Sequence, residues 1–175
     1  NVVGYPNVAA IGTPGNLTIA QIGPVALDSD AGPFVASAID HGFTHVCALA
    51  AGNIRCWGRP AAALGIGATE PLGDDEAPGT APLVNQGWTA ASLSTSSEHT
   101  CAVTSDGGLY CWGANAAGQL GDGSTEARPV ATKIVLGQGQ IVSAVAAGGR
   151  HTCVLLSNGT VRCWGCGVGV SAGAI

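Results

Sequence analysis

Cysteine offers the most chemistry in this sequence of 175 residues, which contains seven cysteines. Six of them fall into three pairs whose members lie nine or ten residues apart: Cys47 and Cys56, Cys101 and Cys111, and Cys153 and Cys163. The seventh, Cys166, ends a Cys-Trp-Gly-Cys sequence. Thiols form disulfides, bind metal ions or carry out redox chemistry, and their spacing indicates which of these to expect.

Each cysteine pair lies in one copy of a repeated motif. The sequence HTCAVTSDGGLYCWG (residues 99–113) recurs as HTCVLLSNGTVRCWG (151–165) and as HVCALAAGNIRCWG (45–58). Successive copies of its histidine are 54 and 52 residues apart, and a period of this length is typical of repeat architectures such as propellers. An apolar stretch at 18–27 resembles the one at 130–136 that precedes the third copy, so the chain holds about three and a third repeats.

The pattern inside each copy predicts a β-hairpin that holds its two cysteines opposite each other. In the second copy the strands flank a turn at 105–107, and the turn of the third is at 157–159. The first copy is one residue shorter, and a two-residue loop at 51–52 still leaves its cysteines opposed. Directly opposed strand positions are about 4.5–5.5 Å apart between Cα atoms, within disulfide range.

We therefore expect three disulfides, each stabilising the fold by about 2–3 kcal/mol in the chain-entropy model. Such bonds persist in oxidising compartments, which predicts a secreted or cell-surface protein. Two alternatives remain open: free thiols at repeated core positions, and zinc, which fits less well because no unit offers closely spaced ligand pairs.

These hairpins place the tryptophans on the side opposite the cysteines, namely Trp57, Trp112 and Trp164. A small sheet with both sides to bury, extended by predicted strands at 143–147 and 129–135, is typical of a propeller blade. The predicted fold is all-β: an incomplete β-propeller of four-stranded antiparallel blades. Its predicted parts are 1–34 (the end of a preceding blade), 35–88, 89–140 and a truncated third repeat at 141–175.

Other residues that could do chemistry have a structural interpretation as well. His45, His99 and His151 occupy the same place in every copy, which favours an architectural role over catalysis, with a metal site of converging histidines as the alternative. The Cys163-to-Cys166 motif resembles a thiol oxidoreductase site, but the repeat pairs Cys163 with Cys153. Cys166 is then free or bonded to another segment or chain.

Acidic and glycine-rich stretches are interpreted as loops. Residues 28–30 and 73–76 are possible calcium ligands but lack the spacing of a known loop, and the glycines at 118–123 lack the sequence that follows a phosphate cradle. Asn16 and Asn158 begin glycosylation sequons. Neither a Ser/His/Asp set nor a carboxylate pair can be argued, so we expect no enzyme, no cofactor and no metal.

Charge excludes several classes of protein. Only 10% of the residues are charged, the formal net charge is −5, and Lys133 is the single lysine, so no basic surface for nucleic acid is expected. With 46% hydrophobic residues the chain is not intrinsically disordered. Glycines and prolines interrupt the uncharged first 27 residues, which therefore predict no membrane span. The start shows no signal-peptide pattern and is typical of a processed or partial chain.

The motif from His99 through Cys-Trp-Gly-Ala-Asn to Gly-Gln-Leu-Gly-Asp-Gly at 118–123 resembles the repeat of the regulator of chromosome condensation family. The resemblance covers nearly the whole chain, although the first copy keeps only 63–67 of the glycine-rich loop and the third ends soon after Gly165. It implies a closed propeller, commonly of seven blades, in which N-terminal strands complete the last blade. The cysteine pairs are similar to those of a secreted bacterial branch.

Function is less determined than fold, because such repeats are scaffolds for unrelated activities. We expect a secreted scaffold for protein interaction or structural assembly, acting through the long loops at 59–80 and 114–128. The alternatives are a proteinaceous inhibitor of the β-lactamase-inhibitor propeller type and, less favoured, guanine-nucleotide exchange or an enzyme. Three repeats leave the end blades uncovered, so partners are another protein or further copies, in an oligomer or a longer chain.

Overall fold

The computed structural model describes residues 24–29, 32–73 and 77–166. Within these residues the chain forms ten β-strands and two short 3-10 helices, and no α-helix. The first sheet holds β1 (Ala38–His41), β2 (His45–Ala50) and β3 (Asn53–Gly58). The second holds β4 (Ala90–Thr95), β5 (His99–Thr104), β6 (Leu109–Gly113) and β7 (Arg128–Ile134). The third holds β8 (Val142–Ala147), β9 (His151–Leu156) and β10 (Val161–Gly165), and the helices are η2 (Ala61–Leu64) and η3 (Pro78–Thr80).

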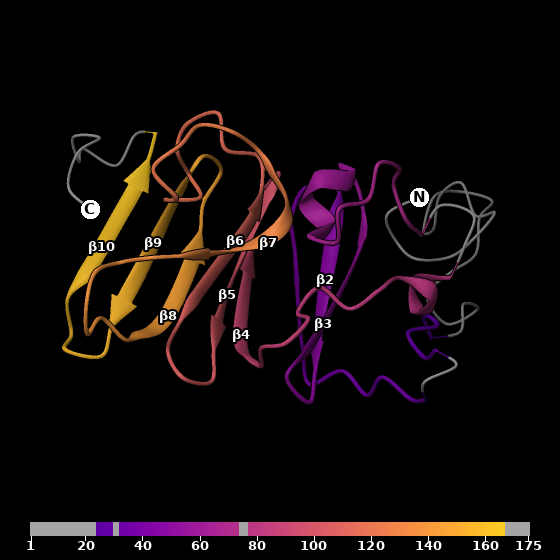
Figure 1. Ribbon diagram of the computed structural model, residues 1–175. Coiled ribbons are helices and arrows are strands. Elements are labelled where there is room, and N and C mark those ends of the chain that lie inside the picture. The colour runs from indigo at the N-terminus through magenta and orange to yellow at the C-terminus, as the bar shows by residue number, and fades with distance from the viewer. Residues whose placement is uncertain (1–23, 30–31, 74–76, 167–175) are drawn as a thin grey trace, which may run out of the picture.

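The three antiparallel sheets stand in a row in sequence order, as Figure 1 shows. This is the predicted all-β blade architecture, and the strands expected at 129–135 and 143–147 are β7 and β8. Among the described residues, only the second sheet has four strands. In the first sheet the fourth strand is replaced by an irregular segment that touches the sheet at a bridge from Gly58 to Leu72 and at a hydrogen bond from Val84 N to Ile54 O.

Proline explains that difference. The segment that should form the fourth strand of the first sheet contains Pro71, Pro78 and Pro82, and each lacks the N–H that a strand ladder needs. η3 begins at Pro78 and interrupts the segment further. The predicted end of the third repeat, at 167–175, and the predicted end of a preceding blade before residue 24 lie outside the described residues.

The hairpin register is the predicted one. Cys47 faces Cys56, Cys101 faces Cys111 and Cys153 faces Cys163. The structure contains a disulfide at each of these positions, with S–S distances of 2.09, 2.08 and 2.09 Å and Cα–Cα distances of 4.1 Å. The shorter first hairpin closes through Ala51 and Gly52, both at positive φ, which keeps the register despite the missing residue.

The core lies between the sheets. We call the side of each sheet that carries its cysteines the disulfide side and the other the tryptophan side. The disulfide side of the first sheet packs on the tryptophan side of the second in one buried cluster: Cys47, Leu49, Ile54, Cys56, Ala102 and Trp112. The second and third sheets repeat this arrangement in another: Cys101, Val103, Leu109, Cys111, Val154 and Trp164. The second sheet is thus buried on both sides, as the sequence pattern predicts.

Candidate functional site

Histidine and threonine link neighbouring sheets through the core. His45 Nε2 lies 2.8 Å from Thr100 Oγ1, and His99 Nε2 lies 2.9 Å from Thr152 Oγ1. Thr152 donates its single hydroxyl hydrogen to the Gln119 carbonyl, at 2.7 Å. The Thr152 oxygen must therefore accept from His99, so that the Nε2 atom of His99 carries the proton. His45 and His99 are therefore connectors between sheets.

Burial keeps both connecting rings neutral. Desolvation lowers the pKa of His45 to about 4, against a smaller opposing effect of Asp40. Desolvation, with His45 and His151 adding to it, lowers the pKa of His99 to about 4 as well. A ring with so low a pKa is uncharged at neutral pH, and each of these has a hydroxyl of the next sheet as neighbour. The geometry therefore gives these histidines a structural connection.

The tryptophans form a second kind of link. Trp112 Nε1 donates to the Ala63 carbonyl and Trp164 Nε1 to the Gln119 carbonyl, each at 2.9 Å. Both acceptors belong to the loop of the preceding repeat, where each is followed by a buried leucine and a glycine. The glycines, at 65 and 121, have φ near +75° and lie so close to the indoles that an added Cβ would be 2.7 and 2.5 Å from Nε1. The loop of one repeat is thereby fixed on the next.

Asn115 organises the glycine-rich loop of the second repeat. Its amide nitrogen donates to Asp122 Oδ1 at 3.0 Å and to the Ser124 carbonyl at 3.1 Å, and its oxygen accepts from Leu120 N at 2.9 Å. Arg128 pairs with Asp122 at 2.6 Å. Desolvation raises the pKa of Asp122, but hydrogen bonds, that from Arg128 the strongest, outweigh it, and the net pKa lies below the ordinary value. The loop predicted to connect blades is an ordered connector.

The remaining predicted sites are placed as follows. Asp28 accepts a hydrogen bond from Phe34 N at 2.8 Å, whereas 74–76 and Asn16 lie outside the described residues. Asn158 is exposed and accepts from Thr160 N at 3.0 Å. Cys166 is exposed and in no disulfide. Over the described residues there is no group of three or more His, Cys, Asp or Glu side chains arranged to hold a metal ion.

One aromatic pair was not anticipated from the sequence. Trp88 stacks on Tyr110 with ring centroids 4.2 Å apart, beside a hollow of about 260 Å³ between the first and second sheets. Ile66, Val130 and Ala131 also line this hollow. The available signal was that Trp88 is the one tryptophan outside the Cys-Trp-Gly motif.

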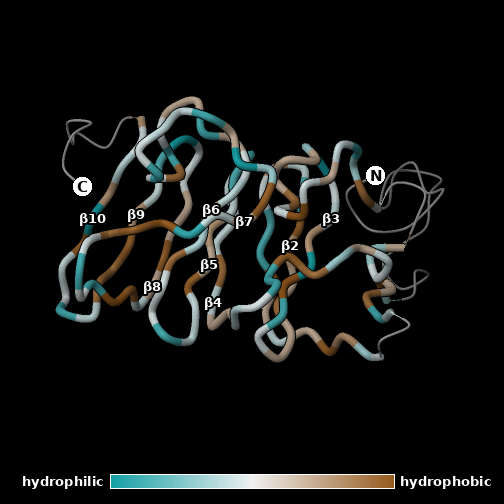
Figure 2. Tube along the Cα trace, in the orientation of Figure 1, coloured by the Kyte–Doolittle hydropathy of each residue, from teal (hydrophilic) through white to brown (hydrophobic). Residues whose placement is uncertain are grey.

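The disulfide side of the third sheet differs from its two counterparts. Leu155 is 41% exposed and Val161 is 62% exposed, whereas the equivalent Val103 and Leu109 of the second sheet are 3% and 1% exposed. Hydrophobic residues lie along β8 and β9, the strands at this end of the row (Figure 2). The row thus ends in an apolar side of the same type that the other sheets bury.

Family models and related proteins both match the repeated motif. Models described as the regulator of chromosome condensation (RCC1) repeat match residues 106–155 and 90–119. The ultraviolet-B receptor UVR8 of Arabidopsis thaliana is 35% identical over 115 residues, which is 65% of this chain and 25% of the receptor. The RCC2 homolog of Danio rerio is 43% identical over 68 residues, 38% of this chain and 14% of that protein.

Solved structures agree on the fold. Human WBSCR16 matches with a TM-score of 0.68 at 22% identity, over 79% of this chain and 34% of that one. Yeast RCC1 (Prp20), solved bound to Kap60, matches with a TM-score of 0.60 at 22% identity, over 74% of this chain and 32% of that one. Our chain therefore spans a quarter of UVR8 and about a third of the solved chains.

No helix in the described part of the chain is both long and apolar enough to cross a membrane. The two repeat models and the relatives agree on the family, and the structural matches agree on the fold. The chain is a regulator of chromosome condensation repeat protein, folded as part of a β-propeller.

Proposed function

We propose that the chain is a secreted, disulfide-crosslinked propeller scaffold for structural assembly or protein interaction. Three disulfides within 175 residues favour an oxidising compartment over the cytosol. The links between sheets use every repeated histidine and tryptophan for architecture, except those at the two ends of the row. A scaffold whose repeated side chains serve packing carries its function on its surfaces.

The observation that carries this proposal is the open disulfide side of the third sheet. Leu155 and Val161 stand where Val103 and Leu109 are buried by a neighbouring sheet. Transfer of such side chains out of water stabilises by about 1.5–3 kcal/mol each when burial is complete. This side is therefore the joining surface of the scaffold.

The internal links indicate what this surface accepts. A matching partner presents a tryptophan-bearing sheet and a hydroxyl placed as in Thr100 and Thr152, to meet the His151 ring. The first sheet of this chain has Val46 at that place, so a second copy added head to tail lacks the hydroxyl. The favoured partner is consequently another repeat of the same family, in the rest of a longer protein or in another polypeptide.

The titles of similar proteins agree with an interaction role without deciding it. Yeast RCC1 (Prp20) was solved bound to Kap60, and the same yeast protein is described by its binding to Gsp1p and histones. The inhibitor alternative would use a different surface, the hollow beside Trp88 and Tyr110, because stacked aromatic side chains are typical of interface anchors.

Light scattering after gel filtration tests the proposal. The oxidised chain, whose joining surface is uncovered, is expected to associate with itself in the absence of the favoured partner and to elute as an oligomer at tens of micromolar, since an apolar surface of this kind associates even where the hydroxyl is missing. The double variant Leu155→Asp, Val161→Asp is expected to be monomeric. The matched control is Val135→Asp, a change at an apolar residue that is exposed elsewhere, and it should associate like the wild type. A monodisperse wild-type monomer, or a control that also becomes monomeric, contradicts the proposal.

A further inference from the structure

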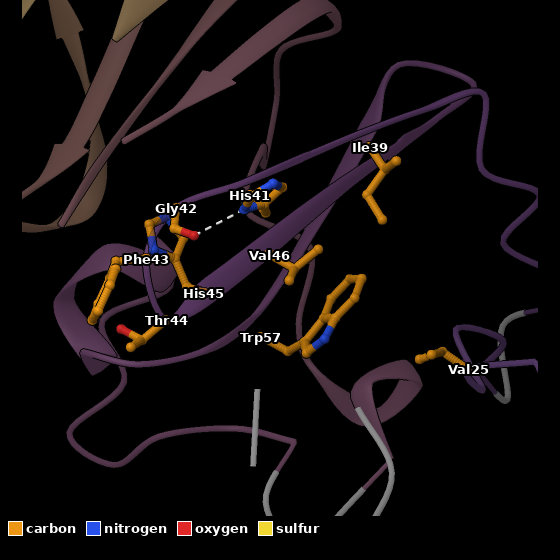
Figure 3. A pocket seen from close by; sticks show the side chains of 9 residues that line it. All are labelled: Val25, Ile39, His41, Gly42, Phe43, Thr44, His45, Val46 and Trp57. Carbon is orange, nitrogen blue, oxygen red and sulfur yellow. Dashed lines mark hydrogen bonds between the residues drawn. The ribbon is translucent and has the colours of Figure 1, made fainter. Parts of the chain in front are cut away.

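The opposite end of the row holds a hollow of about 280 Å³ against the first sheet. Its lining comes from the turn between β1 and β2, from β2 and β3, and from the segment before β1: Val25, Ile39, His41, Gly42, Phe43, Thr44, His45, Val46 and Trp57. Figure 3 shows Trp57 facing this space with Val46 and Val25. Phe43 and Ile39 at its rim are 86% and 67% exposed. The hollow is mainly apolar and open to an occupant.

Trp57 lines this hollow, and its indole donor lacks an acceptor. Trp57 is 3% exposed, and its Nε1–H has no hydrogen-bond partner among the described residues. The equivalent indoles of Trp112 and Trp164 each donate to a backbone carbonyl at 2.9 Å. A buried N–H without an acceptor costs about 1–3 kcal/mol, so native proteins seldom leave one unpaired. The position of Trp57 calls for a carbonyl from outside the described residues.

The two paired indoles define the occupant. In each, the accepting carbonyl belongs to an Ala or Gln, the next residue is a fully buried leucine, and the residue after that is the glycine against the indole ring. A side chain at that glycine would collide with the indole. The occupant that fits Trp57 is therefore a peptide segment that reads Xaa-Leu-Gly or Xaa-Ile-Gly.

The sequence of this chain offers such a segment at the required distance. The acceptor residue precedes its tryptophan by 49 residues in one link and by 45 in the other. Ala10-Ile11-Gly12 lies 47 residues before Trp57. Ile11 lies seven positions after Gly4, and Leu120 lies seven positions after Gly113. The second candidate, Gln21-Ile22-Gly23, lies only 36 residues before Trp57. No charged residue occurs before Asp28, which suits an apolar hollow.

We propose that the hollow against Trp57 is the docking site for residues 10–12 of the same chain, with the Ala10 carbonyl accepting from Trp57 Nε1. These residues lie outside the described part of the structure. Val46 replaces the threonine that also donates to the loop carbonyl in the third sheet, so the indole is the sole polar contact of this link. The specificity then comes from Ile11 filling the apolar space and from the missing side chain at Gly12.

Hydrogen exchange of the indole N–H groups tests this docking. The oxidised, ¹⁵N-labelled full chain is used, and Trp57→Phe assigns the resonance. In the wild type the Trp57 indole should exchange as slowly as those of Trp112 and Trp164. Gly12→Val and Ile11→Asp should each speed exchange at Trp57 about tenfold or more, as expected for the loss of a hydrogen bond. Unchanged exchange at Trp112 and Trp164 shows that the variants fold.

The matched control is Gly23→Val, the same substitution in the segment with the wrong spacing. It should leave the exchange of Trp57 unchanged. The proposal is overturned if Trp57 exchanges freely in the wild type, if Gly23→Val has the larger effect, or if protection at Trp57 depends on protein concentration, which would indicate a second copy as the occupant. Exchange is measured at low protein concentration, because head-to-tail association through the third sheet would bring a second copy onto this end of the row.

Discussion

The second and third sheets carry nearly the same hairpin, and the difference between them lies in what covers the disulfide side. In the second sheet Cys101 and Cys111 are fully buried under the third sheet, whereas Cys153 and Cys163 in the third are partly exposed. His99 bonds across to a threonine of the next sheet, and the His151 ring has no such hydroxyl among the described residues. Equivalent residues therefore contribute to the core only when a neighbouring repeat is present.

The comparison is sharpest for Leu109 and Val161, which occupy equivalent positions in β6 and β10. Leu109→Ala removes a 1% exposed side chain from the core and should lower the free energy of unfolding by about 2–5 kcal/mol. Val161→Ala changes a residue that is 62% exposed and should lower it by about 0.5 kcal/mol or less. Urea unfolding of the oxidised proteins at low concentration measures both. Equal losses would show that the third sheet is covered in solution.

The disulfides provide a second test of the same difference. Replacing Cys101 and Cys111 by Ala should lower the free energy of unfolding by about 3 kcal/mol, the value expected for a loop of ten residues. Mild dithiothreitol should reduce Cys153–Cys163 first, because its sulfurs are the more accessible, and the other two bonds only on unfolding. Timed alkylation and peptide mapping follow the order of reduction. Recovery of Cys101 linked to any cysteine but Cys111 would refute the register.

A third test uses pH, because the neutral, buried His99 must gain a proton when the chain unfolds. The folded pKa of about 4 lies below the ordinary histidine value of 6.5, so the unfolded state binds more protons between these values. Stability should therefore fall as pH drops from about 6.5 to 4, by roughly 3 kcal/mol for one such ring. His45 behaves alike. In His99→Gln the slope of unfolding free energy against pH should be about halved, and in the double variant with His45→Gln it should be largely lost.

Much of this arrangement could be predicted from the sequence, for physical reasons. The first copy is one residue shorter, and a shorter turn keeps its two cysteines opposite each other, which indicates the hairpin register. The period of the motif identifies the blades. The contacts between sheets could not be predicted, because nothing in a single repeat says that the loop carbonyl of one meets the indole of the next. The missing fourth strand of the first sheet could have been predicted from the three prolines in that segment. The stacking of Trp88 on Tyr110 could not, because Trp88 lies outside the repeated motif and Tyr110 inside it.

The smallest expected change in stability concerns the difference between the His45 link and the His99 link. His99 has a partner at each ring nitrogen, since Ser96 Oγ lies 2.6 Å from Nδ1, whereas His45 Nδ1 is buried with no partner among the described residues. The cause is Gly42, which stands where the second repeat has Ser96, and a Cβ at Gly42 would collide with the Ser96 carbonyl. A second partner for His45 thus cannot be added by a substitution at Gly42. The second partner of His99 can be removed by a substitution at Ser96.

Ser96→Ala should do that by leaving His99 Nδ1 buried and unpaired, with a loss of about 1 kcal/mol in the free energy of unfolding. The matched control is Ser94→Ala, which removes an acceptor for Ala147 N at the partly buried edge of the same two sheets and should cost less. Urea unfolding at pH 7 measures both. A loss for Ser96→Ala no larger than that of its control would mean that the second hydrogen bond of His99 contributes nothing, and that the two links are equally strong despite their different partners.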